Sequence, residues 1–258
     1  MKYYVISGEA SGDLHGSNLL RAIQQEDKDA HFRVWGGDLM QACGAELVKH
    51  YRDLAFMGFT EVLMNIRTIF KNIRFCKEDL LHYQPDVLIL IDYPGFNLRI
   101  AEFAHAKGIK VFYYISPQIW AWKQSRVHKI KRVVDRMFVI LPFEKEFYAR
   151  FGVDVSFVGH PLLDAIEHFH HDELFREKYA LDDRPIIALL PGSRQQEISR
   201  MLPDMLKAVE SFGDYQPVIA GAPSITSDKY QEWSGGTAVK VISGATYQLL
   251  AHARGAMV

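Results

Sequence analysis

The run DVLILID at residues 86–92 is apolar at every interior position and carries an aspartate at each end. A strand of this kind is buried on both faces, which is typical of a parallel sheet covered by helices on either side. Shorter apolar runs alternate with longer amphipathic segments before and after it, and this alternation indicates repeated βα units. We therefore predict an α/β fold. Its other strands are expected at residues 3–7, 32–35, 111–115, 137–141 and 155–158, and its clearest helices at residues 14–25, 98–107 and 143–151.

A second βα series begins after a polar, histidine-containing connector at residues 159–172. We place the domain boundary within it, so that residues 1–165 form one Rossmann-like domain and residues 166–258 a second. The second series ends at residues 255–258 with the opening of another strand, which predicts that this domain is incomplete. Its strands are expected at residues 186–190, 217–220 and 239–243, and its helices at residues 195–212, 227–233 and 246–253.

The composition argues against several classes of function. A formal net charge of -1 gives no overall field of the kind that attracts nucleic acid, so we expect no nucleic-acid partner. Two cysteines, Cys43 and Cys76, are too few for a disulfide framework or the usual zinc spacing, which fits a reducing cytosol. No window reaches the ~18 apolar residues that span a bilayer, so we expect a protein that is soluble or peripheral.

The loops after the predicted strands are rich in small, polar and aromatic residues. Ligands of open parallel sheets bind beyond the carboxyl ends of the strands, so these loops should line a cleft. The first loop, GEASGD at residues 8–13, matches neither a dinucleotide fingerprint, a Walker loop nor a nucleophile elbow. A tight turn with Asp13 capping the next helix explains this loop as well as ligand binding does. The candidate cleft residues are Gly8, Glu9, Ser11, Asp13, Asn97, Ser116, Gln118, Trp120, Trp122, Lys123, Arg126 and His160.

Asp92 is the candidate catalytic residue because it ends the all-apolar strand. A carboxylate at this position is expected to be partly desolvated, which suits it to act as a general base. Its position leaves two other roles open, as a cap for the helix that follows or as the partner of a nearby arginine.

Residues 190–194, LPGSR, lie between a strand and a helix of the second series. Free backbone N–H groups at the helix start, together with Arg194, favour a diphosphate site formed by Gly192, Ser193 and Arg194. Glu197 could instead cap the helix without a ligand. We expect no metal, because the D-x-D at residues 27–29 falls on the opposite edge of the sheet and the connector histidines lack a further ligand.

The segment LAFMGFTEVLMNIRTIFKNIRFCK at residues 54–77 is rich in Met, Phe and Ile, with basic residues interleaved. This pattern is typical of a helix on a membrane surface, and equally of a core helix whose basic side chains reach solvent. The candidate membrane-facing residues are Met57, Phe59, Ile69 and Phe70. A second basic run, residues 123–136, could hold a phosphate or an anionic head group, although a solvated helix face explains it too.

Six motifs occur in order along the chain: GEASGD at 8–13, IDYPGFN at 91–97, YYISPQIWAW at 113–122, PFEKEFY at 142–148, GHPLLD at 159–164 and LLPGSR at 189–194. Together they resemble the lipid-A-disaccharide synthases over essentially the whole chain. The resemblance implies a GT-B fold of two Rossmann-like domains, with the acceptor and the membrane on the N-terminal side and the UDP-sugar donor on the C-terminal side. It implies no cofactor.

The resemblance also implies an inverting transfer from UDP-2,3-diacylglucosamine to 2,3-diacylglucosamine 1-phosphate, giving the β-1',6-linked disaccharide of lipid A. The enzyme would be cytoplasmic and peripheral on the inner face of the inner membrane of Gram-negative bacteria, with its anionic lipids as partners. Asp92 would deprotonate the acceptor 6'-hydroxyl, and Arg194 would stabilise the departing UDP.

Two departures from the family pattern matter. The family commonly has a second Asp where this chain has Gly95, so only Asp92 takes the base role. Family members also continue past residue 258 with further donor-binding residues, so activity is expected of the full-length protein. Two other interpretations stay open: an epimerase-like UDP-sugar enzyme of the same architecture, and a non-catalytic module that binds lipid or nucleotide.

Overall fold

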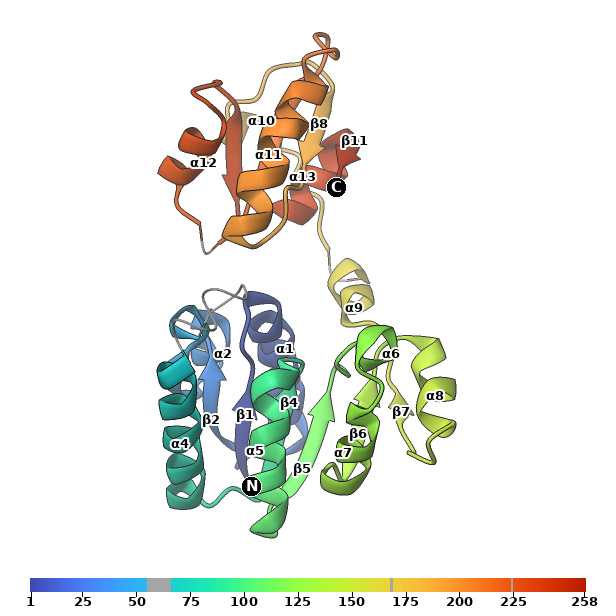
Figure 1. Cartoon of the computed structure of the whole chain (residues 1–258). Coiled ribbons are helices and arrows are strands. Elements are labelled where there is room, and N and C mark those ends of the chain that lie inside the picture. The colour runs from blue at the N-terminus through green and yellow to red at the C-terminus, as the bar shows by residue number, and fades with distance from the viewer. Residues whose placement is uncertain (55–65, 168, 224) are drawn as a thin grey trace. The chain divides into compact units, whose positions relative to one another are not determined.

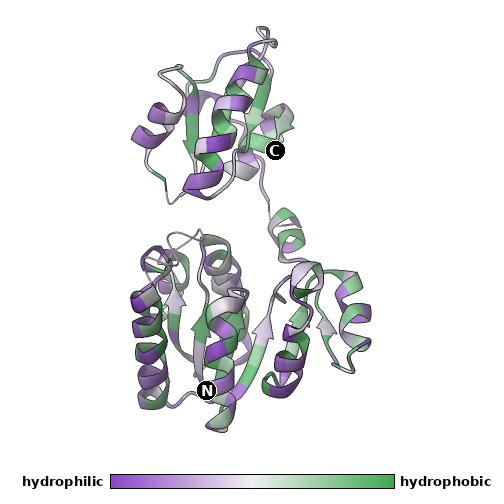
Figure 2. Cartoon of the chain, in the orientation of Figure 1, coloured by the Kyte–Doolittle hydropathy of each residue, from purple (hydrophilic) through white to green (hydrophobic). Residues whose placement is uncertain are grey.

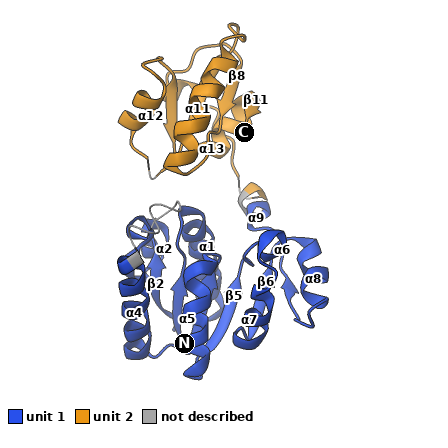
Figure 3. Ribbon diagram, in the orientation of Figure 1, with its two compact units in different colours: residues 1–164 blue, residues 165–258 orange. Residues whose placement is uncertain are grey.

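A computed structural model of the protein describes residues 1–54, 66–167, 169–223 and 225–258 (Figure 1). These residues form two compact units, residues 1–164 and residues 165–258 (Figure 3). Each unit has its own parallel sheet flanked by helices. The predicted α/β fold is therefore confirmed.

The first unit is built on a sheet with the strand order β3-β2-β1-β4-β5-β6-β7. The DVLILID run supplies β4 (Val87–Ile91), which is buried at every position and lies beside β1 (Lys2–Ile6). The strand order reverses between β1 and β4, which is the switch point of a doubly wound sheet. The other strands are β2 (His31–Gly36), β3 (Glu46–His50), β5 (Lys110–Tyr114), β6 (Arg136–Val139) and β7 (Ser156–Phe157).

Alternate side chains of the central strands enter two separate cores. Leu88 and Leu90 of β4 pack with the helices α4, α5 and α7, whereas Ile89 and Ile91 pack with α1 and α2. Burial on both faces explains why β4 tolerates no polar position. The helices of this unit are α1 (Ala10–Glu26), α2 (Asp38–Ala42), α4 (Ile66–Tyr83), α5 (Pro94–Ala106), α6 (Ile119–Trp122), α7 (Arg126–Val133) and α8 (Pro142–Ala149), with a 3-10 turn, η1 (Tyr51–Asp53).

The second unit has the strand order β10-β9-β8-β11, and all of its paired strands are parallel. Hydrophobic residues gather along its strands, whereas its helices carry both polar and apolar residues (Figure 2). One core lies between the sheet and the helices α11 and α12, and the other between the sheet and α10 and α13. The elements are α10 (Phe175–Lys178), β8 (Ile186–Leu189), α11 (Gln195–Val209), β9 (Gln216–Gly221), α12 (Ser227–Trp233), β10 (Lys240–Ser243), α13 (Thr246–His252) and β11 (Ala253–Met257).

A short helix, α9 (Pro161–Glu167), spans the boundary between the two units. None of the helices in the described ranges is both long and apolar enough to cross a membrane.

Candidate functional site

The ends of four strands of the first unit present the predicted cleft residues. Because β1, β4, β5 and β7 belong to one parallel sheet, the residues that follow them come to the same edge. Gly8 and Asp92 flank the switch point between β1 and β4, where ligands of such sheets bind. The predicted residues that follow these strands are Gly8, Glu9, Asp92, Ser116, Gln118 and His160.

A left-handed corner directly follows β4. Asp92 and Tyr93 have φ angles of 42° and 48°, a conformation that is uncommon for residues with a side chain. The fully buried Asn97 stabilises the corner, since its Nδ2 donates to the carbonyl oxygens of Ile91 at 3.2 Å and of Asp92 at 2.7 Å. The Tyr113 hydroxyl donates to the same Asp92 oxygen at 2.5 Å. Asn97, predicted to line the cleft, therefore holds the main chain at Asp92.

The corner corrects two expectations about Asp92. We expected a partly desolvated carboxylate, but Asp92 is exposed because the chain turns away from the sheet directly after Ile91. Asp92 was also a candidate cap for the next helix. Helix α5 begins earlier than predicted, at Pro94, and its N-cap residue is Tyr93.

Strain extends to the neighbouring strand end. Ile115, directly after β5, has a φ of 62°, which is a marked outlier for a β-branched residue. Non-glycine residues in this region cost about 1–3 kcal/mol each and tend to cluster at functional sites. Because β4 pairs with β5, the strained residues Asp92, Tyr93 and Ile115 follow adjacent strands. Three of the five described non-glycine residues with a positive φ therefore lie at this edge of the sheet.

Gly8 has a packing role at the switch point. A Cβ atom built on Gly8 would lie 2.5 Å from Cγ of Tyr93, so any other residue would displace the tyrosine ring. The pKa of Tyr93 is raised by burial and then by the negative charge of Glu9, which keeps the phenol neutral. Tyr93, which the sequence did not single out, thus covers the glycine turn after β1.

The loop after β5 divides into buried and exposed residues. The buried Ser116 hydroxyl lies 2.7 Å from the hydroxyl of Tyr148. Trp120 packs edge-to-face against Phe143 with a centroid distance of 4.9 Å, whereas Trp122 is 83% exposed. Both tryptophans lie on the short helix α6. Of the remaining predicted residues here, Gln118 and Lys123 are exposed and Arg126 is half-buried.

The GEASGD loop continues directly into helix α1, which begins at Ala10. One explanation of this loop was that Asp13 caps the helix, but Asp13 lies in the first turn of α1 and caps α2 instead. Its carboxylate accepts hydrogen bonds from the backbone N–H groups of Gly37, Leu39 and Met40 at 2.8, 3.0 and 3.1 Å. Asp13 is buried and holds two helices together, while Ser11 is exposed and Glu9 half-buried.

A histidine pair links α1 to the loop after β7. His15 of α1 has its pKa lowered by burial and then by the nearby charge of His160. Both rings are half-buried. The sequence predicted only His160, and His15 carried no signal because it sits in a helical pattern.

The predicted diphosphate residues lie at the start of α11 in the second unit. Gly192 has a φ of 110°, and Ser193 and Arg194 are exposed. Glu197 accepts a hydrogen bond from the Arg194 backbone N–H at 3.3 Å, and the Arg194 guanidinium lies 3.0 Å from the same carboxylate. The capping role considered for Glu197 is therefore realised. The same N–H groups and Arg194 remain suitable for an anion that displaces the carboxylate.

The described parts of the chain contain no cluster of three or more His, Cys, Asp or Glu residues that could hold a metal ion.

Of the predicted membrane-facing residues, Met57 and Phe59 lie outside the described residues. Ile69 is half-buried and packs against the larger core, whereas Phe70 is 58% exposed on α4.

Two Rossmann-like units in one chain are the architecture of proteins with the GT-B type of fold. The crystal structure of UDP-GlcNAc 2-epimerase from Neisseria meningitidis bound to UDP-GlcNAc is similar, with a TM-score of 0.64. The similarity covers 99% of this chain and 77% of that one at 11% sequence identity, which shows the fold alone.

The sequence shows which family within this class. The lipid-A-disaccharide synthetase family model matches residues 3–258, and the chain belongs to this family. It is 45% identical to the lipid-A-disaccharide synthase of Trichlorobacter lovleyi over 90% of this chain, and 42% identical to that of Syntrophus aciditrophicus over 98%. The chain covers 62% and 68% of the lengths of these two relatives.

Proposed function

We propose that this chain provides the acceptor side and part of the donor side of a glycosyltransferase that makes the lipid A disaccharide. The donor would be UDP-2,3-diacylglucosamine and the acceptor 2,3-diacylglucosamine 1-phosphate. The observation that carries the proposal is the strained corner at the end of β4, where Asp92 follows the strand at the switch point of the sheet in a chain of this family. Residues 1–164 would receive the acceptor and residues 165–258 the donor.

In the proposed reaction, Asp92 accepts the proton of the acceptor 6'-hydroxyl as its oxygen attacks the anomeric carbon of the donor. The bond from that carbon to the diphosphate breaks on the opposite face, so the configuration inverts and UDP leaves. The leaving diphosphate gains negative charge, which Arg194 and the N–H groups at the start of α11 can stabilise. For this step the Arg194 guanidinium releases the Glu197 carboxylate and binds a phosphate oxygen of the donor instead.

The test of this mechanism is an assay of disaccharide formation by the full-length protein in excess EDTA. We expect full activity, because the leaving-group charge is assigned to Arg194 and helix α11 rather than to a metal. Loss of activity that magnesium restores would show that the donor site is wrongly assigned. Absence of turnover with both substrates, at any metal concentration, would favour a non-catalytic binding module.

We also propose that α4 associates with the inner face of the inner membrane. Phe70 and Phe75 are 58% and 44% exposed, and the basic residues Arg67, Lys71 and Arg74 are exposed on the same helix. Exposed aromatic residues among basic ones are characteristic of helices that lie on anionic membranes.

Replacing Phe70 by Ser should weaken binding to anionic vesicles by roughly 10- to 100-fold, since burying a Phe side chain contributes about 1.5–3 kcal/mol. Co-sedimentation with vesicles measures the change, and a thermal melt of the same sample should be unaltered because Phe70 is exposed. Phe157→Ser provides the control, as Phe157 is 46% exposed on β7 rather than on α4. An equal loss of vesicle binding in both variants, or no loss in either, would show that α4 is not the docking helix.

A further inference from the structure

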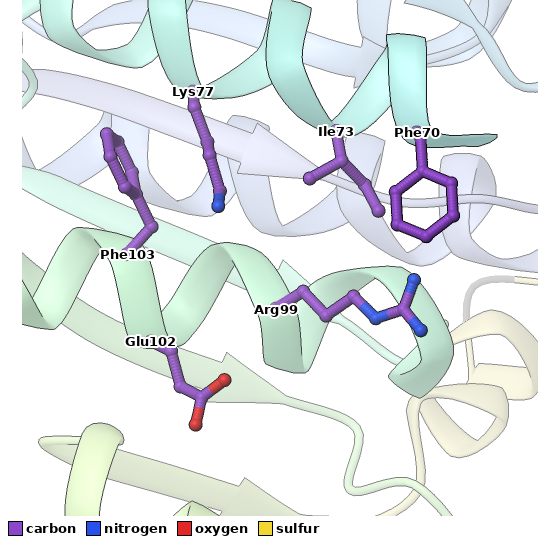
Figure 4. Close-up of a pocket in the computed structure, with 6 residues that line it drawn as sticks. All are labelled: Phe70, Ile73, Lys77, Arg99, Glu102 and Phe103. Carbon is purple, nitrogen blue, oxygen red and sulfur yellow. The ribbon is translucent and has the colours of Figure 1, made fainter. Parts of the chain in front are cut away.

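A hollow of about 410 Å³ lies between α4 and α5 (Figure 4). Phe70, Ile73 and Lys77 line it from α4, and Arg99, Glu102 and Phe103 line it from α5. None of the residues assigned above to the acceptor or donor forms its walls. The residues proposed for glycosyl transfer therefore do not explain this hollow.

Two cations in the hollow lie against aromatic rings. The Lys77 ammonium is 5.1 Å from the centroid of Phe103, and the Arg99 guanidinium is 5.8 Å from that of Phe70. Figure 4 shows Lys77 reaching from α4 toward α5 beside Phe103. Within the described part of the chain, neither cation forms an ion pair with a carboxylate. Their positive charges are thus available to a ligand.

The acid among the lining residues does not cancel these charges. Glu102 binds Lys129 at 2.8 Å and Arg132 at 2.7 Å, both on α7. In Figure 4 its carboxylate points away from α4. Its pKa is lowered, chiefly by the hydrogen bond from Lys129, so it stays ionised in these pairs. The hollow consequently combines two uncompensated cations with apolar walls.

We propose that this hollow binds the phosphate head group of an anionic membrane phospholipid. Lys77 and Arg99 match a phosphate in charge, and the Phe70 and Phe103 rings match the apolar part of a lipid. The hollow is continuous with the exposed Phe70, from which acyl chains could enter a bilayer. The inference rests on the proposed membrane association of α4 and assigns that association a specific site.

The test uses the chain as it stands and vesicles of phosphatidylcholine with about one-third phosphatidylglycerol. The double variant Lys77→Gln/Arg99→Gln should bind roughly 30-fold more weakly, because each basic residue at an anionic surface contributes about 1 kcal/mol. The control Lys145→Gln/Arg150→Gln removes the same charge from two exposed residues, one on α8 and one at its C-cap, and should change binding less than threefold. Equal losses in the two double variants would indicate unspecific attraction and overturn the proposal.

A second measurement separates a lipid from a free anion. Monomeric dihexanoyl phosphatidylglycerol should shift the NMR signals of α4 and α5 residues in the wild type, and it should not do so in Lys77→Gln/Arg99→Gln. Inorganic phosphate at the same concentration should produce much smaller shifts, since it cannot contact Phe70 and Phe103. Equal affinity for inorganic phosphate would overturn the lipid assignment.

These outcomes are distinct from those of the wider proposals. Failure of the wild type to bind vesicles would contradict both the proposed docking of α4 and the proposed head-group site. Vesicle binding that depends on Phe70 but not on Lys77 and Arg99 would remove the head-group site alone. Neither measurement involves glycosyl transfer, so neither tests the assignment of Asp92 as the general base.

Discussion

Replacing Asp92 by Asn should reduce turnover by roughly 10²–10⁴-fold at saturating substrates while leaving UDP binding unchanged, as expected for loss of a general base. Asn has nearly the same shape as Asp, and it tolerates the left-handed conformation that residue 92 adopts with a φ of 42°. The variant should therefore keep the corner, including the hydrogen bonds from Asn97 and Tyr113 to the main-chain oxygen. Steady-state kinetics on an active preparation, with calorimetry of UDP binding, measure the two effects.

Asp154→Asn is the matched control, because Asp154 is an exposed aspartate that follows α8 and lies outside the candidate site. It should turn over at the wild-type rate. Near-normal turnover by Asp92→Asn would show that another group accepts the proton. Loss of UDP binding together with turnover would point to a structural change at the corner instead.

The central strands were predictable because burial on both faces leaves a strong sequence signal. DVLILID became β4, and the apolar runs predicted at residues 3–7 and 111–115 became its neighbours β1 and β5. The edge strand β3 was missed, since its five positions are exposed or half-buried and its sequence ELVKH mixes polar and apolar residues. Helix α2 was missed because it is only five residues long and depends on the distant Asp13 for its cap.

The loops of the candidate site were predictable, but their geometry was not. Tyr113 looked like an ordinary core residue of β5, and only the β4–β5 register, which pairs it with Leu90, brings its hydroxyl to the Asp92 oxygen. The left-handed conformations of Asp92 and Tyr93 likewise depend on contacts that exist only in the folded chain. A pattern of residue types identifies the strand end, whereas the hydrogen bonds from Asn97 and Tyr113 fix the main chain at Asp92.

The assignments of acceptor and donor sides stay predictions for a related reason. At the start of α11 the sequence allowed both a cap and an anion site, because a carboxylate and a phosphate are stabilised there by the same N–H groups. The structure shows Glu197 in the capping role. Both uses are compatible if a ligand displaces the carboxylate.

Replacing Asp79 by Ala should destabilise the first unit by about 3–5 kcal/mol, the usual cost of removing one partner from a buried ion pair. Asp79 of α4 is 8% exposed and accepts hydrogen bonds from Arg33 of β2 at 2.6 and 2.9 Å. It also accepts one from the Tyr4 hydroxyl at 2.6 Å, and Tyr4 in turn accepts one from Trp35 at 2.7 Å. The loss should appear as a lower urea midpoint.

Glu46→Gln is the control for Asp79→Ala because Glu46 pairs with the same arginine but is 64% exposed. An exposed pair contributes about 0–1 kcal/mol, so this variant should unfold close to the wild type. A comparable loss in the two variants would mean that the buried network does not hold α4 to the sheet.

The same network predicts how stability depends on pH. Burial alone would raise the pKa of Asp79, but the hydrogen bonds from Arg33 and Tyr4 outweigh it, so the pKa is lowered from its usual value of 3.8. The unfolded chain then binds this proton more readily than the folded one. The stabilisation is therefore complete well above pH 4 and is lost as the pH falls through the lowered pKa that Asp79 has in the folded protein.

In Asp79→Asn this part of the acid sensitivity should disappear, so the free energies of unfolding of variant and wild type should converge below pH 4. A constant difference between them from pH 7 to pH 3 would contradict the assignment.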